Sequence, residues 1–576
     1  MDRRTIWAIL FMMVIAIAPA IFIKRPPKSA VPPVPQADTS TRVPQTDTTT
    51  RVPSAQRSDS ATPTVSPGPA APAGAVRAAD TVRVVSPLYT YGISTRGGGL
   101  LDATLHRYRS MAPGQRGSTA QILPPNSQLL DLTLVIGRDT TPLRDWIFTP
   151  SADSLTVDRP TSLRLTGSQR GITVDLTYAF RPDDYLVDVS GKVEGVGPNG
   201  GVLLVGMGPT LANTEANEVE NQHALALVTK RNEAERMDFS GLKPGEPKTV
   251  SGPLEWAAVK SKYFVTAILA YDSTGGVISG ANAVARASEE KRPTAADIRL
   301  SLPLPPSGTF HYSVYAGPME YDRLSRIGHD FDDVNPYGWP GFRAIIRPVA
   351  VAVRWLLVWM HEHLHLAYGL VLIFFGILVR LLLWPLNQKA MRANLKLQEV
   401  QPLMKDIQER YKSDPQRMQQ EMFKLYKEYN VNPLGGCWPM LLPMPVLFAL
   451  FFVFGNTIEL RDASFLWLPD LSRPDPLYII PVIMGLSMYG LSKMGQMGME
   501  PNPQMKMMLY VMPIMMTFLF LNFASGLNLY YAVSNLASIP QQWLLARERQ
   551  KRTAKAIVEV KTKPEADKLA PRKKKA

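Results

Sequence analysis

A single arginine interrupts a long apolar stretch in this 576-residue chain. Arg380 stands within VLIFFGILVRLLLWPL, a sequence with the composition of a membrane span. An arginine at the centre of a bilayer costs about 2.5–3.5 kcal/mol on insertion scales, so Arg380 needs a wet cavity or a partner. The alternative is snorkelling, because only about 9 Å of helix rise separates Arg380 from Leu386, near the expected headgroups. The residues alone leave both interpretations open.

A row of polar residues marks the last apolar segment, ASGLNLYYAVSNLASIPQQWLL. At about 100° per residue, the members of this row fall within roughly 80° of one another around a helix. The row consists of Asn528, Tyr531, Asn535, Ser538 and Gln542. A polar row in a membrane helix is expected to face a bundle interior or a water-filled groove. We favour a groove, because simple interhelical hydrogen bonding, the alternative, needs fewer aligned residues.

A charged segment, 387–433, follows the span that carries Arg380. The sequence Ser413-Asp414-Pro415 predicts a turn near its middle, and helical spacing follows the turn. The apolar positions of that second helix are Met418, Met422, Leu425, Tyr426 and Tyr429. We therefore expect a helical hairpin whose Met-rich face could bind varied apolar segments, because methionine repacks easily. Packing of one hairpin helix on the other is the simpler alternative for this face.

Regions of very different composition divide the chain. Residues 5–23 are apolar without a break, which predicts a transmembrane signal anchor at 1–25, with a cleaved signal sequence as the alternative. Residues 26–80 contain no aromatic residue and are rich in Pro, Ser and Thr, which predicts a disordered linker. The other expected regions are a β domain at 81–335, an interfacial helix at 341–365, a five-helix core at 366–546 and a basic tail at 547–576.

Residues 81–335 have the pattern of a large antiparallel β sandwich. In residues 171–180, GITVDLTYAF, apolar and polar side chains alternate, and RPDD at 181–184 supplies a turn before a return strand. Similar short runs occur at 129–135, 154–166, 263–270, 296–304 and 309–315. Many strands separated by turn signals are typical of an all-β sandwich.

Catalytic and metal-binding patterns are missing from the sequence. Cys437 is the only cysteine, which excludes an intrachain disulfide and a multi-cysteine metal site. The histidines of the β region occur singly, and no nucleophile elbow or phosphate-binding loop is present. We therefore expect neither enzymatic activity, nor a metal, nor a cofactor.

Loop charges predict the orientation in a membrane. The candidate spans after the anchor are 367–386, 434–455, 476–492, 507–523 and 525–545, which makes six in total. Loop 387–433 holds nine Lys and Arg residues, whereas loop 456–475 holds two against four acids. The tail holds twelve basic residues against four acids. Because positive loops stay in the cytoplasm, both termini are expected there and the β domain outside.

An amphipathic helix is predicted just before the second span. Its polar residues are Arg343, Arg347, Arg354, His361 and His365. On a helix these fall within roughly 40° of one another, while the other faces carry Val, Ile, Leu and Trp. We expect this helix to lie in the outer membrane interface, with Pro348 at its start.

Three motifs in this C-terminal half are similar to those of one known family. The sequence NPLGGCWP at 432–439, followed by Met444-Pro445, resembles the third-span signature of the YidC membrane-protein insertases (the YidC/Oxa/Alb family). The residues VR at 379–380 with WPL at 384–386 resemble the second span of that family. The residues SGL, LYY and SNL between 525 and 536 resemble its last span. The resemblance runs through about 340–546 without a gap, and Pro443 is a departure from the pattern.

The β region resembles the large periplasmic domain of the Gram-negative members, through Trp256, KYF at 262–264 and VYAGP at 314–318. The resemblance implies a periplasmic β-supersandwich and a six-span protein of the inner membrane that inserts and helps to fold membrane proteins. In that family a hydrophilic groove opens to the cytoplasm and to lipid, and the arginine matching Arg380 attracts acidic residues of the incoming chain. The resemblance also adds Met444 to the expected groove residues.

The same resemblance implies a set of partners. These are nascent membrane proteins, the Sec translocon with its accessory subunits, the ribosome through the basic tail and cytoplasmic loops, and anionic lipids. The electrostatic part of such binding should depend strongly on salt.

Two other classes of function stay open on the sequence. One is a polytopic transporter or channel with Arg380 as its solute site, against which stands the lack of a detectable internal repeat. The other is a membrane-anchored periplasmic binding protein or sugar enzyme, because a sandwich fold does not determine function. Five clustered spans with a polar row are more than such an anchor needs.

Overall fold

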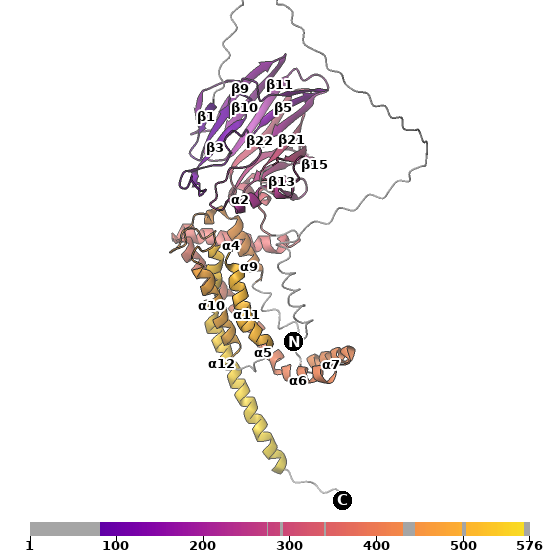
Figure 1. Cartoon of the computed structure of the whole chain (residues 1–576), viewed down its shortest axis with the longest axis vertical. Helices are drawn as coiled ribbons and strands as arrows, with labels where there is room; N and C mark the ends of the chain where they lie inside the picture. Colours follow the sequence, from indigo (N-terminus) through magenta and orange to yellow (C-terminus); the bar gives the residue numbers. More distant parts are fainter. Residues whose placement is uncertain are drawn as a thin grey trace, which may run out of the picture. The chain divides into compact units, whose positions relative to one another are not determined.

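The structure is a computed structural model that describes residues 81–273, 275–287, 292–338, 341–429, 444–497 and 503–569. The expected anchor 1–25, the linker 26–80 and the motif at 432–439 lie outside the described residues. Two parts follow one another along the chain, a β part up to about residue 335 and a helical part after it (Figure 1).

Three β sheets and one short ribbon build the β part, and nearly all of the pairings are antiparallel. The largest sheet has nine strands, in the order β14 (Ala234–Asp238), β13 (Ala226–Lys230), β16 (Trp256–Lys260), β17 (Phe264–Leu269), β22 (Thr309–Pro318), β11 (Leu186–Glu194), β10 (Ile172–Phe180), β9 (Thr161–Gln169) and β7 (Thr149–Pro150). The six-stranded sheet has the order β15 (Pro247–Leu254), β20 (Ile278–Ala285), β21 (Ala296–Leu304), β12 (Gly201–Gly206), β5 (Asp131–Ile136) and β6 (Asp139–Pro142).

The five-stranded sheet has the order β4 (Thr119–Gln121), β3 (Leu100–Arg109), β2 (Tyr89–Ser94), β1 (Thr81–Val85) and β8 (Ser154–Thr156). Strands β18 (Tyr271–Asp272) and β19 (Gly275–Gly276) form the ribbon, and the short helices of this part are α2 (Glu218–Ala224), η1 (Phe239–Gly241), α3 (Tyr321–Ile327) and η2 (Phe331–Val334). The three sheets bury one common apolar core. The predicted all-β sandwich is thereby confirmed.

The alternation that predicted these strands also fixes their faces. In β10 the buried side chains are Val174, Leu176, Tyr178 and Phe180, which alternate with less buried polar residues. Strand β10 pairs with both β9 and β11 in continuous antiparallel register, so this inward face is a continuous one. The buried hydroxyl of Tyr178 donates a hydrogen bond of 2.6 Å to the carbonyl of Gly98, which satisfies its polar atom.

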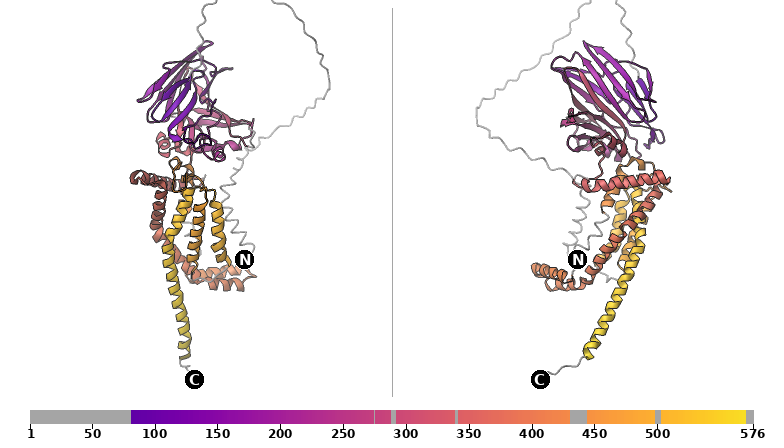
Figure 2. Two further views of the ribbon diagram at one scale, coloured as in Figure 1. Left: turned by 60° about the vertical axis from the view of Figure 1, so that its left-hand side comes forward. Right: turned by 180° about the vertical axis from the view of Figure 1, so that it is seen from behind.

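The helical part contains the candidate membrane segments. Its helices are α4 (Arg343–Leu364), α5 (Tyr368–Glu399), α6 (Gln401–Arg410), α7 (Pro415–Glu428), α9 (Met444–Asn456), η4 (Ile458–Leu460), α10 (Ile479–Gly495), α11 (Pro503–Phe520) and α12 (Ser525–Leu569). Figures 1 and 2 show α5, α9, α10, α11 and α12 side by side, with α4 lying across them. An apolar core of their own holds these helices together.

Length and composition qualify two of the described helices as membrane spans, Arg343–Leu364 and Tyr368–Pro385. Three shorter apolar helices accompany them: Met444–Asn456, Ile479–Gly495 and Lys506–Phe520. The expected count of six spans therefore stays a prediction. A short apolar helix fits a bilayer through local thinning of the bilayer or through oligomerisation.

One detail of the amphipathic helix was predicted wrongly. Pro348 was expected to open it, but α4 begins at Arg343 and contains Pro348 within its second turn. As the sixth residue of the helix, Pro348 lacks the N–H that would bond to the carbonyl of Ala344, so α4 continues past it with one backbone hydrogen bond fewer. Arg343 and Arg347 consequently belong to the helix itself rather than to its cap.

Candidate functional site

Arg380 lies at the contact between α5 and α12. Its Nε donates hydrogen bonds of 2.8 Å to the hydroxyl of Ser534 and 3.1 Å to the carbonyl of the same residue. Among the described residues, no carboxylate forms an ion pair with Arg380. Snorkelling alone therefore does not describe Arg380, because its guanidinium donates hydrogen bonds to the neighbouring helix α12.

The polar row on α12 lies against α10 and the C-terminal end of α11. Asn535 donates a bond of 3.1 Å to the hydroxyl of Ser487 on α10, and both groups are buried. Asn528 is fully buried and its amide donates to the carbonyl of Phe520 at 3.0 Å. The Oδ1 atom of Asn528 is buried without a partner among the described residues.

The other three members of the row are placed differently. Ser538 bonds back to the carbonyl of Ser534 within its own helix, at 2.7 Å. The ring of Tyr531 is half-buried and packs edge-to-face on Phe520, with the ring centroids 5.5 Å apart. Gln542 is half-buried, and its side chain makes no hydrogen bond to any residue in the part of the chain that the structure describes. The row thus contains both interhelical bonds and partly accessible groups, and the groove stays a prediction.

Arg380 contacts α12 at the edge of the polar row. Ser534, the partner of Arg380, lies about 120° around the helix from Asn528 but only about 40° from Ser538, at the other end of the row. Gln541 is on nearly the same side, and its amide donates a bond of 3.0 Å to the carbonyl of Trp384 on α5. Ser534 and Gln541 are seven residues apart, which is about two helical turns, so they share one side of the helix. This spacing is visible in the sequence, but the pair was not predicted.

Small residues let these helices approach closely. A Cβ at Gly376 of α5 would lie 3.2 Å from a methyl group of Val533 on α12. A Cβ at Gly485 of α10 would collide with the hydroxyl of Thr517 on α11. Membrane helices use small residues in this way because close backbone packing is a main source of their association.

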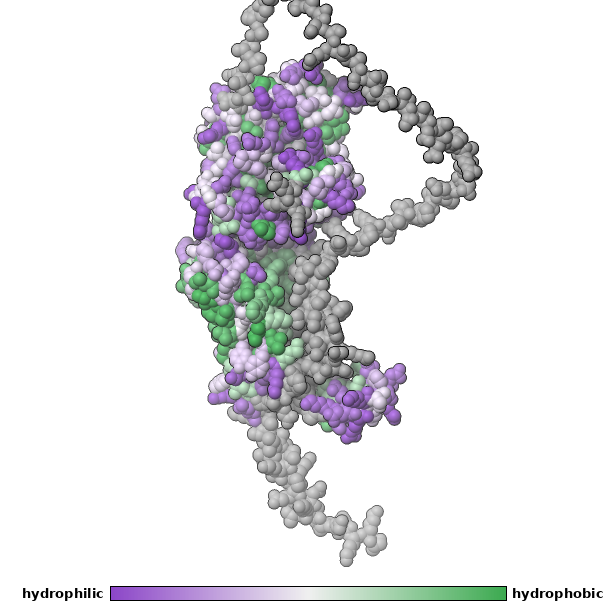
Figure 3. All heavy atoms as spheres, viewed as in Figure 1, coloured by the Kyte–Doolittle hydropathy of each residue, from purple (hydrophilic) through white to green (hydrophobic). Residues whose placement is uncertain are grey.

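Apolar side chains dominate the surface of the bundle, whereas the sandwich and the α6–α7 hairpin are largely hydrophilic in the face shown in Figure 3. The exposed apolar residues of α5 and α11 include Phe374, Leu381, Leu382, Ile514 and Phe518. Exposed apolar area of this extent marks a surface that contacts lipid or a partner.

The expected hairpin is present as α6 and α7. Asp414 caps α7 by accepting a bond of 3.1 Å from the amide of Arg417, and Pro415 takes the first helical position. Leu425 is buried against Val400 of the α5–α6 junction, with Met404 and Ile407 packed beside it. This is the simpler alternative, packing of helix on helix.

The remaining predicted contact residues of the hairpin are Met418, Met422 and Tyr426, which are half-buried. They can therefore both pack within the hairpin and meet a partner. Met444, the other expected groove residue, is half-buried at the first position of α9.

Two known families together match most of the chain. Residues 81–351 match the YidC periplasmic domain, and residues 359–553 match the 60Kd inner membrane protein family. The two matched segments correspond to the sandwich with part of α4, and to the helical bundle.

Individual relatives match over nearly the whole length. The membrane protein insertase YidC of Geobacter metallireducens is 31% identical over 561 residues, which cover 94% of this chain and 98% of that protein. The protein of the same name from Chlorobaculum tepidum is 30% identical and covers 84% of this chain and 85% of its own. A solved active YidC insertase is 18% identical, covers 81% of this chain and 93% of that chain, and has a TM-score of 0.33.

Proposed function

This chain belongs to the YidC family of membrane protein insertases in the inner membrane, and from that premise we propose that Arg380 guides acidic segments of incoming proteins along α12. The insertase function comes with the family. The proposal concerns the path of the client through the bundle and the role of Arg380 in it.

The observation that carries this proposal is that only one of the three guanidinium nitrogens of Arg380 donates hydrogen bonds to the described residues. Both of the hydrogen bonds that Arg380 makes to the described residues use Nε, and both go to Ser534. The terminal NH2 groups are left for a carboxylate, with which arginine forms strong charge-assisted bonds. An uncompensated cation at membrane depth is costly, and such residues generally serve a function.

The polar row supports a path for the polar part of the client. Tyr531 and Gln542 are only half-buried. Their polar groups can exchange hydrogen bonds with a passing backbone, which lowers the cost of moving polar groups into the membrane. The apolar segment then enters the bilayer by hydrophobic transfer, so no nucleotide is required.

Partners and orientation follow as further parts of the proposal. The tail 547–576 is strongly basic and would approach ribosomal RNA or anionic lipid. The α6–α7 hairpin would lie in the cytoplasm and the sandwich in the periplasm, with both termini cytoplasmic. Cooperation with the Sec translocon and its accessory subunits belongs to this proposal as well.

Photo-crosslinking to stalled ribosome–nascent-chain complexes tests the path. A crosslinker at Tyr531 is compared with one at Leu536, which lies on α12 with 49% of its surface exposed and faces outward. We expect strong crosslinks to the client at position 531 and weak ones at 536. Absence of any difference between the positions, in a folded protein, would reduce the row to interhelical hydrogen bonding.

The role of Arg380 is tested with two clients that differ only in the charge of the translocated tail. Arg380→Glu should weaken crosslinks and insertion of the acidic-tailed client, because like charges repel, while the neutral-tailed client is much less affected. Arg380→Lys should keep part of the activity. Equal losses for both clients would assign Arg380 to packing, and a solute-dependent current in proteoliposomes would support the transporter alternative.

A further inference from the structure

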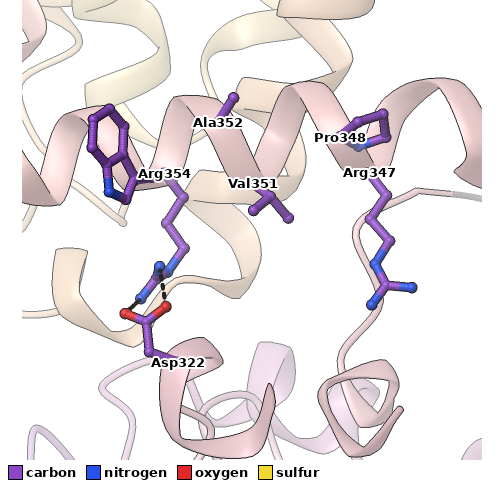
Figure 4. Close-up of a pocket in the computed structure, with 7 residues that line it drawn as sticks. Asp322, Arg347, Pro348, Val351, Ala352 and Arg354 are labelled. Atoms are coloured by element: carbon purple, nitrogen blue, oxygen red, sulfur yellow. Dashed lines mark hydrogen bonds and ion pairs between the residues drawn. The ribbon is translucent and has the colours of Figure 1, made fainter. Parts of the chain in front are cut away.

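A hollow of about 490 Å³ lies beside α4, away from the groove residues on α12 (Figure 4). Six of its seven lining residues belong to α4, and the seventh is Asp322 of α3. Figure 4 shows Asp322 beneath the helix, facing Arg354, with Arg347 further along the same side. The hollow is thus bounded by a membrane-side helix and the end of the β part.

The two sides of this hollow have opposite character. Arg347 and Arg354 lie within about 20° of each other around α4. Trp355, Pro348 and Ala352 lie roughly 100–160° further round. The hollow therefore crosses the boundary between the cationic and the apolar face of the helix. A ligand that fits it must be charged at one end and apolar at the other.

The apolar side continues along α4 as an exposed surface. Trp355 is 60% exposed, and Ile345 and Trp359 on the same face are 58% and 38% exposed. Tryptophan at such a position is typical of the boundary between headgroups and hydrocarbon. This continuity makes a membrane lipid, rather than a soluble molecule, the amphipathic ligand.

On the charged side of the hollow, the most exposed charged group is the carboxylate of Asp322. Arg354 is almost fully buried and gives its terminal NH2 groups to Asp322, at 3.1 and 2.8 Å, and to Glu459, at 2.7 Å. Arg347 bonds to Asp332 at 2.6 Å. By contrast, the Asp322 side chain is 68% exposed although it pairs with Arg354. The most accessible charge in the hollow is therefore a carboxylate.

The charges around the hollow are balanced. The ion-pair cluster contains four carboxylates and three guanidinium groups (Arg343, Arg347, Arg354, Asp322, Asp332, Asp333 and Glu459), and Arg326, whose Nε donates to the Asp322 carbonyl at 3.1 Å, adds a fourth guanidinium. Balanced charges suit a zwitterionic headgroup better than a purely anionic one.

We propose that this hollow binds a zwitterionic phospholipid with a primary ammonium headgroup, of the phosphatidylethanolamine type. The ammonium donates to the Asp322 carboxylate, the phosphate lies beside the partly exposed Arg347, and the glycerol and upper acyl chain run along Trp355. A choline headgroup is a poor substitute because its quaternary nitrogen has no N–H to donate. The site is independent of the groove and of the insertion path proposed for Arg380.

Native mass spectrometry of the full-length protein in detergent tests the site with three lipids of matched chains: phosphatidylethanolamine, phosphatidylcholine and phosphatidylglycerol. We expect retention of the ethanolamine lipid to exceed that of the choline lipid about ten-fold, the effect of one charge-assisted hydrogen bond. Asp322→Asn should remove this preference. The matched control is Asp139→Asn, which removes an exposed charge on β6, far in sequence from the residues of the hollow. This variant should keep the preference for the ethanolamine lipid.

A second variant keeps the test decisive if Asp322→Asn disturbs folding. Val351→Trp places a large side chain into the middle of the hollow and leaves every charged group in place. It should lower retention of the ethanolamine lipid. Equal retention of all three lipids, or a preference for phosphatidylglycerol, would overturn the proposal, because ordinary boundary lipid or an arginine-held anion would then explain the hollow.

Discussion

Among single residues, Lys260 on β16 is an unusual one, because its side chain is buried in the sandwich. Its Nζ donates a bond of 2.7 Å to Asn335, and only 2% of the residue is exposed. Burial lowers the pKa of Lys260 well below its ordinary value, and nearby Arg236 lowers it further against the opposing effect of Asp238. A buried ammonium is costly even with a hydrogen-bond partner.

Lys260→Met should therefore stabilise the sandwich at neutral pH, by about 1–2 kcal/mol after the lost bond to Asn335 is counted. Because the folded-state pKa is the lower one, the cost of the lysine is full below that pKa and declines as the pH rises toward its unfolded value. The gain should shrink accordingly between neutral pH and pH ~10. Thermal unfolding of both proteins across this range measures it, and a variant less stable at pH 7 would contradict the expectation.

At the scale of elements, the α6–α7 hairpin depends on local signals. Asp414 and Pro415 start α7 as their residue types predict, and Leu425 anchors α7 on the α5–α6 junction. The buried contacts of the hairpin are few, so caps make a large share of its stability. Its exposed residues, such as Phe423 at 65%, stay available for partners.

Asp414→Ala should destabilise the first turn of α7 by about 1 kcal/mol, because the amide of Arg417 loses its acceptor. Amide hydrogen exchange in that turn should then rise about five-fold. Asp414→Ser serves as the matched control, since serine also caps helices and should restore slow exchange. An unchanged exchange rate in the alanine variant would show that the hairpin is held by its packing alone.

At the scale of the whole molecule, the segment that joins α9 to α10 links the sandwich with the bundle. Ile458 belongs to the apolar core of the sandwich, and Arg461 pairs with buried Glu215, its Nε lying 3.0 Å from both carboxylate oxygens. Further along, the amides of Ser525 and Gly526 at the start of α12 donate to carbonyls of this segment. The helix that carries the polar row is thus connected to the outer domain.

Arg461→Met should weaken this link strongly, because it leaves the Glu215 carboxylate buried without its charged partner, at a cost of about 3–5 kcal/mol. We expect faster hydrogen exchange in both Ile458–Leu460 and β17, which lies beneath the arginine. The double variant Arg461→Met with Glu215→Gln removes both charges and should recover most of the protection. Equal exchange in the single and double variants would deny a role for the ion pair.

The sequence by itself determined the elements and their faces. Alternation placed Val174 and Leu176 in the sandwich core, and Asp414-Pro415 marked the start of α7. These features follow from periodicity and from local backbone chemistry, which act over a few residues and need no knowledge of neighbours. The motifs around Arg380 and in the last span likewise pointed to the family to which the chain belongs.

Only the tertiary structure decided which residues meet. Arg380 bonds to Ser534, 154 positions later, and Arg461 to Glu215, 246 positions earlier, so no local pattern could pair them. Arg380 contacts α12 at Ser534, beside the polar row, and α12 presents polar groups both to α5 and to α10. The helix period fixes the angles between side chains, but the neighbour that each side contacts depends on how the whole bundle packs.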